Sequence, residues 1–116
     1  AARDIAAAGA RSKASLAREL LPVVDNLERA LESAEEGDGG LADGVRLVHA
    51  ELVEVLQRNG VEPLEPGGEP FDPNVHEALS TRSEDGAEAG VVLDVVQKGY
   101  RLEGAVLRPA RVVVAA

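Results

Sequence analysis

The chain has 116 residues, a mass of 12.1 kDa, a net charge of −9 and 45% hydrophobic residues, which is typical of one globular domain or of two very small ones. The negative charge argues against nucleic-acid binding, which requires a positive surface. The absence of Cys excludes disulfides and thiolate chemistry, and no apolar run approaches the length of a membrane span.

Residues 1–60 have the apolar spacing of two helices. In residues 1–34 a seam of heptad type consists of Leu16, Leu20, Val23, Leu27, Ala30 and Ala34, widened by Val24 and Leu31. A glycine-rich loop at 36–40 interrupts it, and a second seam follows in residues 41–58, made of Leu41, Val45, Val48, Leu52, Val55 and Leu56. The two segments predict an antiparallel helical hairpin, whose first helix continues through Pro22 with a kink.

The predicted helices differ in length, which has a consequence for assembly. At 1.5 Å per residue the first helix spans about 50 Å and the second about 27 Å, so the first extends roughly 20 Å beyond its partner. Two helices without aromatic residues also cannot bury a full core. We therefore expect a homodimer with a four-helix bundle. The expected dimerisation residues are Leu20, Val23, Leu27, Leu31, Val45, Val48, Leu52 and Leu56.

Asn59-Gly60 resembles a helix C-cap and marks a boundary, so the predicted domains are residues 1–60 and 61–116. The second domain is expected to be small and mostly antiparallel β, which makes the chain α+β. Strands are predicted at 61–64, 91–96, 100–102, 106–107 and 111–114, with turns at 65–68 and an acidic loop at 84–90. Asp72-Pro73 resembles a helix N-terminus, which predicts one helical turn over 75–79.

The residues that could carry chemistry are few. His76-Glu77-Ala78-Leu79-Ser80 resembles a zinc-binding H-E-x-x-H motif that lacks its second His, so a local hydrogen bond of His76 beside a capping Asp72 is the favoured interpretation. Gly44 inside the second helix indicates either fraying or close approach of another backbone or of a partner surface. The stretch 93–111 carries net positive charge, as a solvated strand face or as a docking face for an acidic surface.

Four blocks of this sequence, in order, resemble the GrpE family. The first is Leu20-Leu21-Pro22-Val23-Val24-Asp25-Asn26-Leu27-Glu28-Arg29-Ala30-Leu31, and Gly60-Val61-Glu62 closes the second helix as in that family. The others are Phe71-Asp72-Pro73-Asn74-Val75-His76-Glu77-Ala78, Val96-Gln97-Lys98-Gly99-Tyr100-Arg101-Leu102, and Val106-Leu107-Arg108-Pro109-Ala110-Arg111-Val112-Val113-Val114.

The resemblance implies a homodimeric nucleotide exchange factor, a co-chaperone of the bacterial cytoplasm that serves DnaK-type heat-shock chaperones. Its paired helices would lead into a bundle, and a β "wing" would hold open the nucleotide cleft of the chaperone's ATPase domain until ADP leaves. The factor would bind no nucleotide, metal or other cofactor and catalyse no reaction. Carried over residue by residue, the chaperone contacts are Val96, Arg108, Val114, Gly44 and Leu16.

Two expectations remain open at this point. Val112, Val113 and Val114 cannot all face one side of a strand, and by the resemblance we expect Val114 to point outward beside Arg108. The alternative function is that of a structural dimerisation or adaptor protein without exchange activity.

Overall fold

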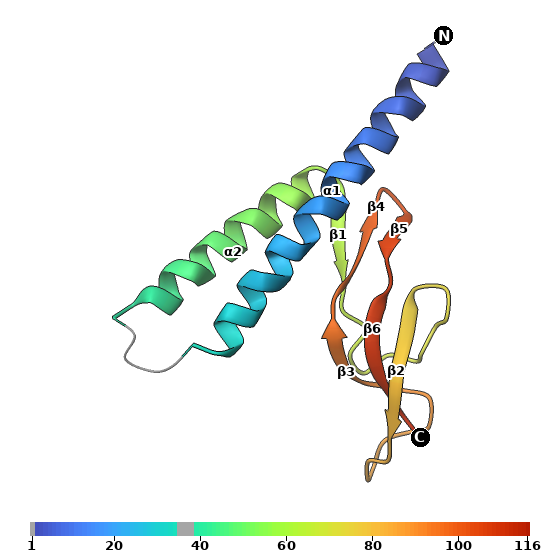
Figure 1. The fold of residues 1–116 in the computed structure, drawn as a ribbon. Helices are drawn as coiled ribbons and strands as arrows, with labels where there is room; N and C mark the ends of the chain where they lie inside the picture. Colours follow the sequence, from blue (N-terminus) through green and yellow to red (C-terminus); the bar gives the residue numbers. More distant parts are fainter. Residues whose placement is uncertain (1, 35–38) are drawn as a thin grey trace. The chain divides into compact units, whose positions relative to one another are not determined.

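The computed structural model describes residues 2–34 and 39–116. It divides into two compact units, Ala1–Gly60 and Val61–Ala116. The first is helical and the second is built of strands (Figure 1), so the α+β class predicted from the sequence is confirmed. Residues 36–38 of the glycine-rich loop predicted at 36–40 lie outside the described residues.

The helical unit is a hairpin of α1 (Ala2–Glu32) and α2 (Leu41–Arg58), which pack side by side in opposite directions (Figure 1). Helix α1 continues through Pro22, as predicted. Helix α2 ends as its sequence indicates: the Asn59 amide donates to the carbonyls of Val55 and Leu56, and Gly60 takes a positive φ of 85°. An L-residue adopts this conformation only with strain, so Gly60 ends the helix cleanly.

The burial in α1 follows a stripe next to the predicted seam. Ala17, Leu21 and Val24 are the buried residues of α1, whereas Leu16 and Val23, one position earlier, are exposed. One position corresponds to about 100° around a helix. The helical unit therefore carries two adjacent apolar stripes on α1, of which the chain covers one.

The β unit consists of six short strands in two sheets. They are β1 (Val61–Leu64), β2 (His76–Arg82), β3 (Val92–Gln97), β4 (Gly99–Leu102), β5 (Ala105–Arg108) and β6 (Ala110–Ala115). The sheets have the orders β1-β4-β5 and β2-β6-β3. All pairings are antiparallel except β2 with β6, which is parallel.

The core of the second sheet lies on one face of β6. Ala110, Val112 and Val114 alternate inward and pack with Val92, and Phe71 and Val95 cover them. The buried hydrophobic residues of the first sheet are Tyr100, Val61 and Leu102. The two sheets lie close together at Gly99, where a Cβ would lie 2.5 Å from the Ala110 amide nitrogen.

The helical turn predicted over 75–79 is wrong. Asp72 does accept hydrogen bonds as a cap does, with its carboxylate bound to the Asn74 amide at 2.9 Å, but the chain then leaves the turn as strand β2. The reason is tertiary: the Val75 carbonyl accepts from the Ala110 amide at 3.0 Å, and β2 continues this pairing along β6. Pairing with a buried strand overrides the local helix signal.

Candidate interaction surfaces

Val96 is the most exposed large hydrophobic residue of the β unit. The pairing of β3 with β6 slips between Val95 and Gln97, so Val96 is an extra residue at a bulge and its side chain is 60% exposed. Bulges commonly re-aim one side chain out of a sheet. The geometry places Val96 where a partner can contact it.

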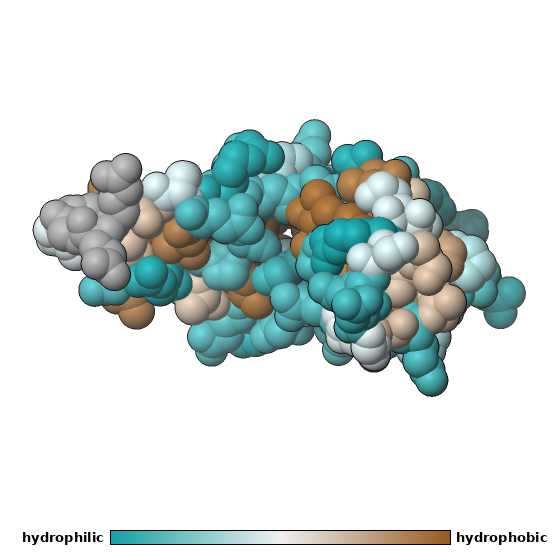
Figure 2. Space-filling view, turned by 90° about the horizontal axis from the view of Figure 1, so that it is seen from below, coloured by the Kyte–Doolittle hydropathy of each residue, from teal (hydrophilic) through white to brown (hydrophobic). Residues whose placement is uncertain are grey.

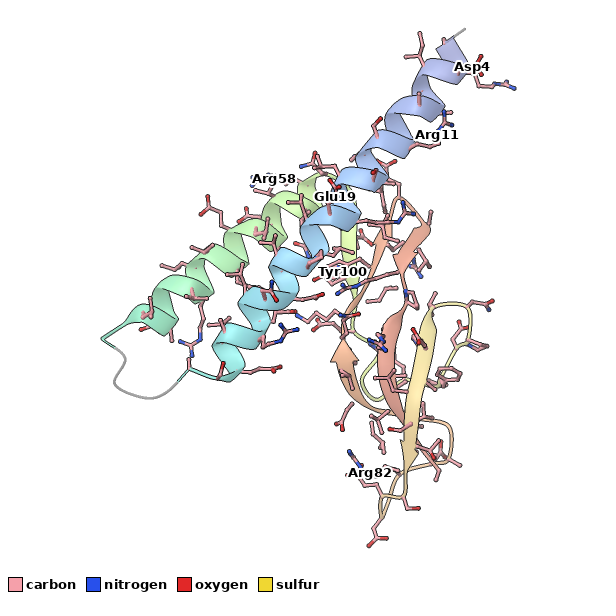
Figure 3. All side chains as sticks on the ribbon, viewed as in Figure 1. Asp4, Arg11, Glu19, Arg58, Arg82 and Tyr100 are labelled. Carbon is pink, nitrogen blue, oxygen red and sulfur yellow. The ribbon has the colours of Figure 1, made fainter. Side chains whose placement is uncertain are left out.

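Arg108 is held in place by contacts with Lys98 and Tyr100. Its Nε donates to the Lys98 carbonyl at 2.9 Å, and its guanidinium lies 5.3 Å from the centre of the Tyr100 ring. A cation stacked on an aromatic face loses little freedom when it binds a further partner. Tyr100 itself lies on β4 (Figure 3) and is buried, with an exposed fraction of 2%. The arrangement makes Arg108 a fixed, half-buried cation.

The expectation that Val114 points outward is wrong. Its exposed fraction is 7%, because β6 turns Val112 and Val114 together into the core and leaves Val113 on the opposite face. Side chains alternate between the two faces of a strand, but three consecutive valines do not indicate which of them face the core. The half-buried residue that β6 offers to the outer face is Val113, whose register partners are Ser80 and Asp94.

An ion pair crosses this outer face. Arg82 at the end of β2 (Figure 3) donates to Asp94 on β3 at 2.7 Å and lies 3.6 Å from Glu84. Because β6 separates the two strands, the pair spans β6 near Val113. The hydrogen bond to Asp94 and the charge of that carboxylate raise the pKa of the Arg82 guanidinium above its ordinary value.

Apolar side chains also reach the surface of the helical unit, among hydrophilic ones (Figure 2). On α2 three of them recur every seven residues: Leu41, Val48 and Val55 are all exposed. On α1, Leu16 and Val23 lie in one exposed stripe. Surface strips at heptad spacing are the usual contacts between packed helices.

The predicted dimerisation residues divide into three groups by burial. Val23 and Val48 are exposed, and Leu56 is already buried within the chain. The half-buried members are Leu20, Leu27, Leu31, Val45 and Leu52. Half-buried residues at the rim of an exposed strip gain further burial when a second apolar surface covers it.

Gly44 lies three residues into α2, and its amide donates to the Gly40 carbonyl at 3.1 Å. A Cβ at this position would meet no atom within 4 Å. Within the described chain, therefore, no close approach of a backbone requires a glycine here.

Sequence reasoning missed two exposed apolar residues. Leu79 occupies another register slip, between Ala78 and Ser80 on β2, and is 42% exposed. It was hidden by the incorrect helical interpretation of this segment. Leu47 on α2 is 72% exposed and lies outside the predicted seam.

The local interpretation of His76 is confirmed: its Nδ1 accepts a hydrogen bond from the Asp72 amide at 2.8 Å. In residues 2–34 and 39–116, no three His, Asp or Glu side chains gather to hold a metal ion. Within the same residues, no helix has the length and apolarity needed to cross a bilayer.

Comparison with known proteins gives a consistent result. The family model for GrpE matches residues 1–116. The chain is 52% identical over 96 residues to Protein GrpE of a Psychrobacter species, with 83% of this chain and 47% of the relative covered. For Protein GrpE of Vibrio vulnificus the identity is 45% over 102 residues, covering 85% of the chain and 52% of the relative.

A more complete alignment is found with Protein GrpE of Francisella tularensis subsp. holarctica. Its identity is 41% over 116 residues, with 98% of this chain and 60% of the relative covered. The chain thus spans about half the length of the curated relatives that it matches.

Proposed function

Because the chain belongs to the GrpE family, we propose that it acts as a homodimeric co-chaperone of a DnaK-type chaperone. It binds the chaperone's ATPase domain and accelerates the release of ADP, so that ATP can bind again. The observation that carries the proposal is the match of the family model over residues 1–116, which covers the helical hairpin and the β unit alike.

The mechanism needs only differential binding. A factor that binds the open conformation of a nucleotide cleft more tightly than the closed one shifts the population toward the open form. To move that equilibrium from 1:99 to 99:1, the preference must be about 10⁴-fold. No proton transfer or bond cleavage is required of the factor.

The exposed apolar strips support a homodimer through the helical unit. Val48 on α2 and Val23 on α1 are about half exposed in the single chain. A second copy that packs its own strips against these completes a four-helix bundle and removes the apolar surface from water. Leu16 and Gly44, by resemblance, belong to the chaperone-binding surface of this unit.

In the β unit, we assign the chaperone contact to Val96 and Arg108, and to Val113 in place of Val114. Val96 contributes exposed apolar area, and Arg108 is a cation fixed against Tyr100. This combination suits a partner surface with an apolar patch and a carboxylate. Val114 has too little exposed surface for this role.

The test is the release of a fluorescent ADP analogue from a DnaK-type chaperone, measured by stopped flow with and without this protein. We expect acceleration that saturates with protein concentration. Val96→Asp should reduce the acceleration, and Thr81→Asp, at an exposed position on the other edge strand of the same sheet, serves as the control. Absence of acceleration at saturation would favour the adaptor function.

A further inference from the structure

The segment 72–76 forms a turn that is closed by its own hydrogen bonds. The Asp72 carbonyl accepts from the amides of Val75 at 3.1 Å and His76 at 2.8 Å. The Asp72 carboxylate accepts from the Asn74 amide. The remaining polar group of the Asp72 backbone, its amide, donates to Nδ1 of the His76 ring at 2.8 Å. The hydrogen bond to the imidazole thus satisfies the remaining backbone group of Asp72 and closes the turn.

This last bond fixes the protonation state of the ring. A backbone amide can only donate, so Nδ1 must accept, and the single proton of the neutral ring must be on Nε2. A doubly protonated imidazolium has two N–H groups and no acceptor. The folded turn is therefore incompatible with the charged ring.

Burial works in the same direction. His76 is 8% exposed, and its ring lies 5.7 Å from the Phe71 ring. A charge at this place would lose most of its hydration. His76 is also the first residue of β2, opposite the fully buried Ala110 on β6.

We propose that His76 is a proton-sensitive latch of the β unit. In the neutral state, the ring closes the turn and starts the parallel pairing of β2 with β6. Protonation removes the acceptor for the Asp72 amide and opens the turn, and the beginning of β2 loosens with it. The latch thus controls the order of the edge strand in the sheet that also carries Val96 and Val113.

The charged groups nearest to His76 in sequence and register are three. The Asp72 carboxylate is held by the Asn74 amide. Glu77, the next residue on β2, lies 3.8 Å from Arg111 on β6, so this carboxylate already faces a cation. Each of these two carboxylates therefore already has its own partner in the closed turn.

The direction of the pH effect follows from linkage. A proton on Nδ1 and the hydrogen bond from the Asp72 amide exclude each other, so a proton can bind there only when the turn is open. Because the open form then binds more protons than the closed form, stability of the turn falls as the pH falls.

The other histidine, His49, lies in the helical unit and closes no turn of this kind. His49 on α2 has a buried Nε2 without a hydrogen-bond partner among the described residues, 3.9 Å from the Glu28 carboxylate. The chain has two histidines, so His49→Gln leaves His76 as the sole source of imidazole signals. This variant is the background for the measurement.

The experiment is NMR of the full chain in that background. Long-range ¹H–¹⁵N spectra identify the protonated ring nitrogen, and hydrogen exchange, corrected for intrinsic rates, gives the protection of the Asp72 and Ala110 amides. At about pH 7.5 we expect the proton on Nε2. From there to about pH 5 the protection of the Asp72 amide should fall about fivefold or more, as expected for a lost hydrogen bond.

His76→Asn is the matched variant, because the Asn side-chain oxygen can take the place of Nδ1 but does not titrate. Its Asp72 protection should change less than about twofold over the same range. The proposal is overturned by a proton on Nδ1 at neutral pH, or by a ring that becomes charged while Asp72 stays protected. A ring that stays neutral to pH 5 overturns it as well. These three results come from the unsubstituted His76, so they stand even when the Asn variant does not fold.

Discussion

The two units differ in how far each covers its own apolar residues. The β unit buries a valine-rich core and exposes two large apolar side chains among its described residues, Leu79 and Val96. The helical unit buries few residues and exposes many. Its exposed large apolar residues are Ile5, Leu16, Val23, Leu41, Leu47, Val48 and Val55.

Under the proposed function, the difference separates the unit that needs a partner for its stability from the unit that uses a partner for its activity. A sheet that completes its own core can use a single exposed side chain, such as Val96, as a contact. In the proposed dimer, a second copy stabilises the helical hairpin by covering its exposed strips at heptad spacing. Substitutions in the β unit should therefore act on the single chain, and those in the helical strips on assembly.

The largest loss of stability is expected for a substitution at Gly99, inside the β unit, which covers its own core. A Cβ there would meet backbone atoms of Pro109 and Ala110 within 3 Å, and backbone cannot move aside as a flexible side chain does. Gly99→Ala should destabilise the β unit by about 3 kcal/mol. Urea unfolding followed by Tyr100 fluorescence measures it, since Tyr100 is the only tyrosine and Trp is absent.

Gly67→Ala is the control for this substitution, because a Cβ at Gly67 meets no atom within 4 Å. Equal stability of the two variants would show that the sheets separate easily at Gly99, and that the β unit is less rigid than its core indicates.

The second effect tests the phase of β6. Val112 is fully buried and Val113 is half-buried on the other face. Val112→Ala should cost about 2 kcal/mol through lost burial and a residual cavity, and Val113→Ala less than about 1 kcal/mol. The same fluorescence measurement applies. The reverse order would mean that the sheet's core lies on the face we describe as outer.

The third effect concerns assembly and should leave the single chain intact. Val48 is 55% exposed and belongs to the heptad strip, so Val48→Asp should weaken the proposed dimer about tenfold or more. Sedimentation equilibrium shows this as a shift toward the 12.1 kDa monomer. Leu47, its neighbour, is 72% exposed and lies off the strip, so Leu47→Asp should have little effect.

Equal weakening by both substitutions would mean that the second copy covers a different side of α2. A wild-type protein that is monomeric at micromolar concentration would contradict the dimer itself.

Most of the fold could be predicted from the sequence because its signals are local. Heptad spacing predicted both helices, and Asn59-Gly60 predicted the end of α2. Runs of Val between Gly or Pro predicted strands of the β unit. The exception is 75–79, where capping residues before an apolar segment predicted a helix. The parallel pairing with β6 decides that segment, and a partner more than thirty residues away leaves no local signal.

The candidate contact surface was less predictable for a related reason. In Val112–Val114, each residue suits either face, so the inward phase depends on which of them meets Val92 across the sheet. The bulges that expose Leu79 and Val96 are register slips between strands, which spacing along one strand cannot show. The stacking of Arg108 on Tyr100 likewise joins two strands.

The smallest loss of stability is expected for a substitution at Arg82. Here an ion pair rather than packing connects the edge strands β2 and β3 of the β unit. Arg82 and Asp94 have side chains about half exposed, although their hydrogen bond is short, at 2.7 Å. Exposed ion pairs contribute little to stability and are screened by salt. Arg82→Gln should therefore lower the melting temperature slightly in low salt and not at all in about 1 M salt, where the screening length is about 3 Å. Thr81→Ser, at the preceding exposed position, controls for changes at the end of β2.

The pH dependence of this ion pair is a second check. Since the raised pKa keeps Arg82 charged, the difference in melting temperature between the wild type and Arg82→Gln should not vary between about pH 6 and pH 9. A large loss of stability that persists in high salt would show that Arg82 protects Val113 by covering it, and that the outer face of β6 depends on side-chain cover just as the helical strips do.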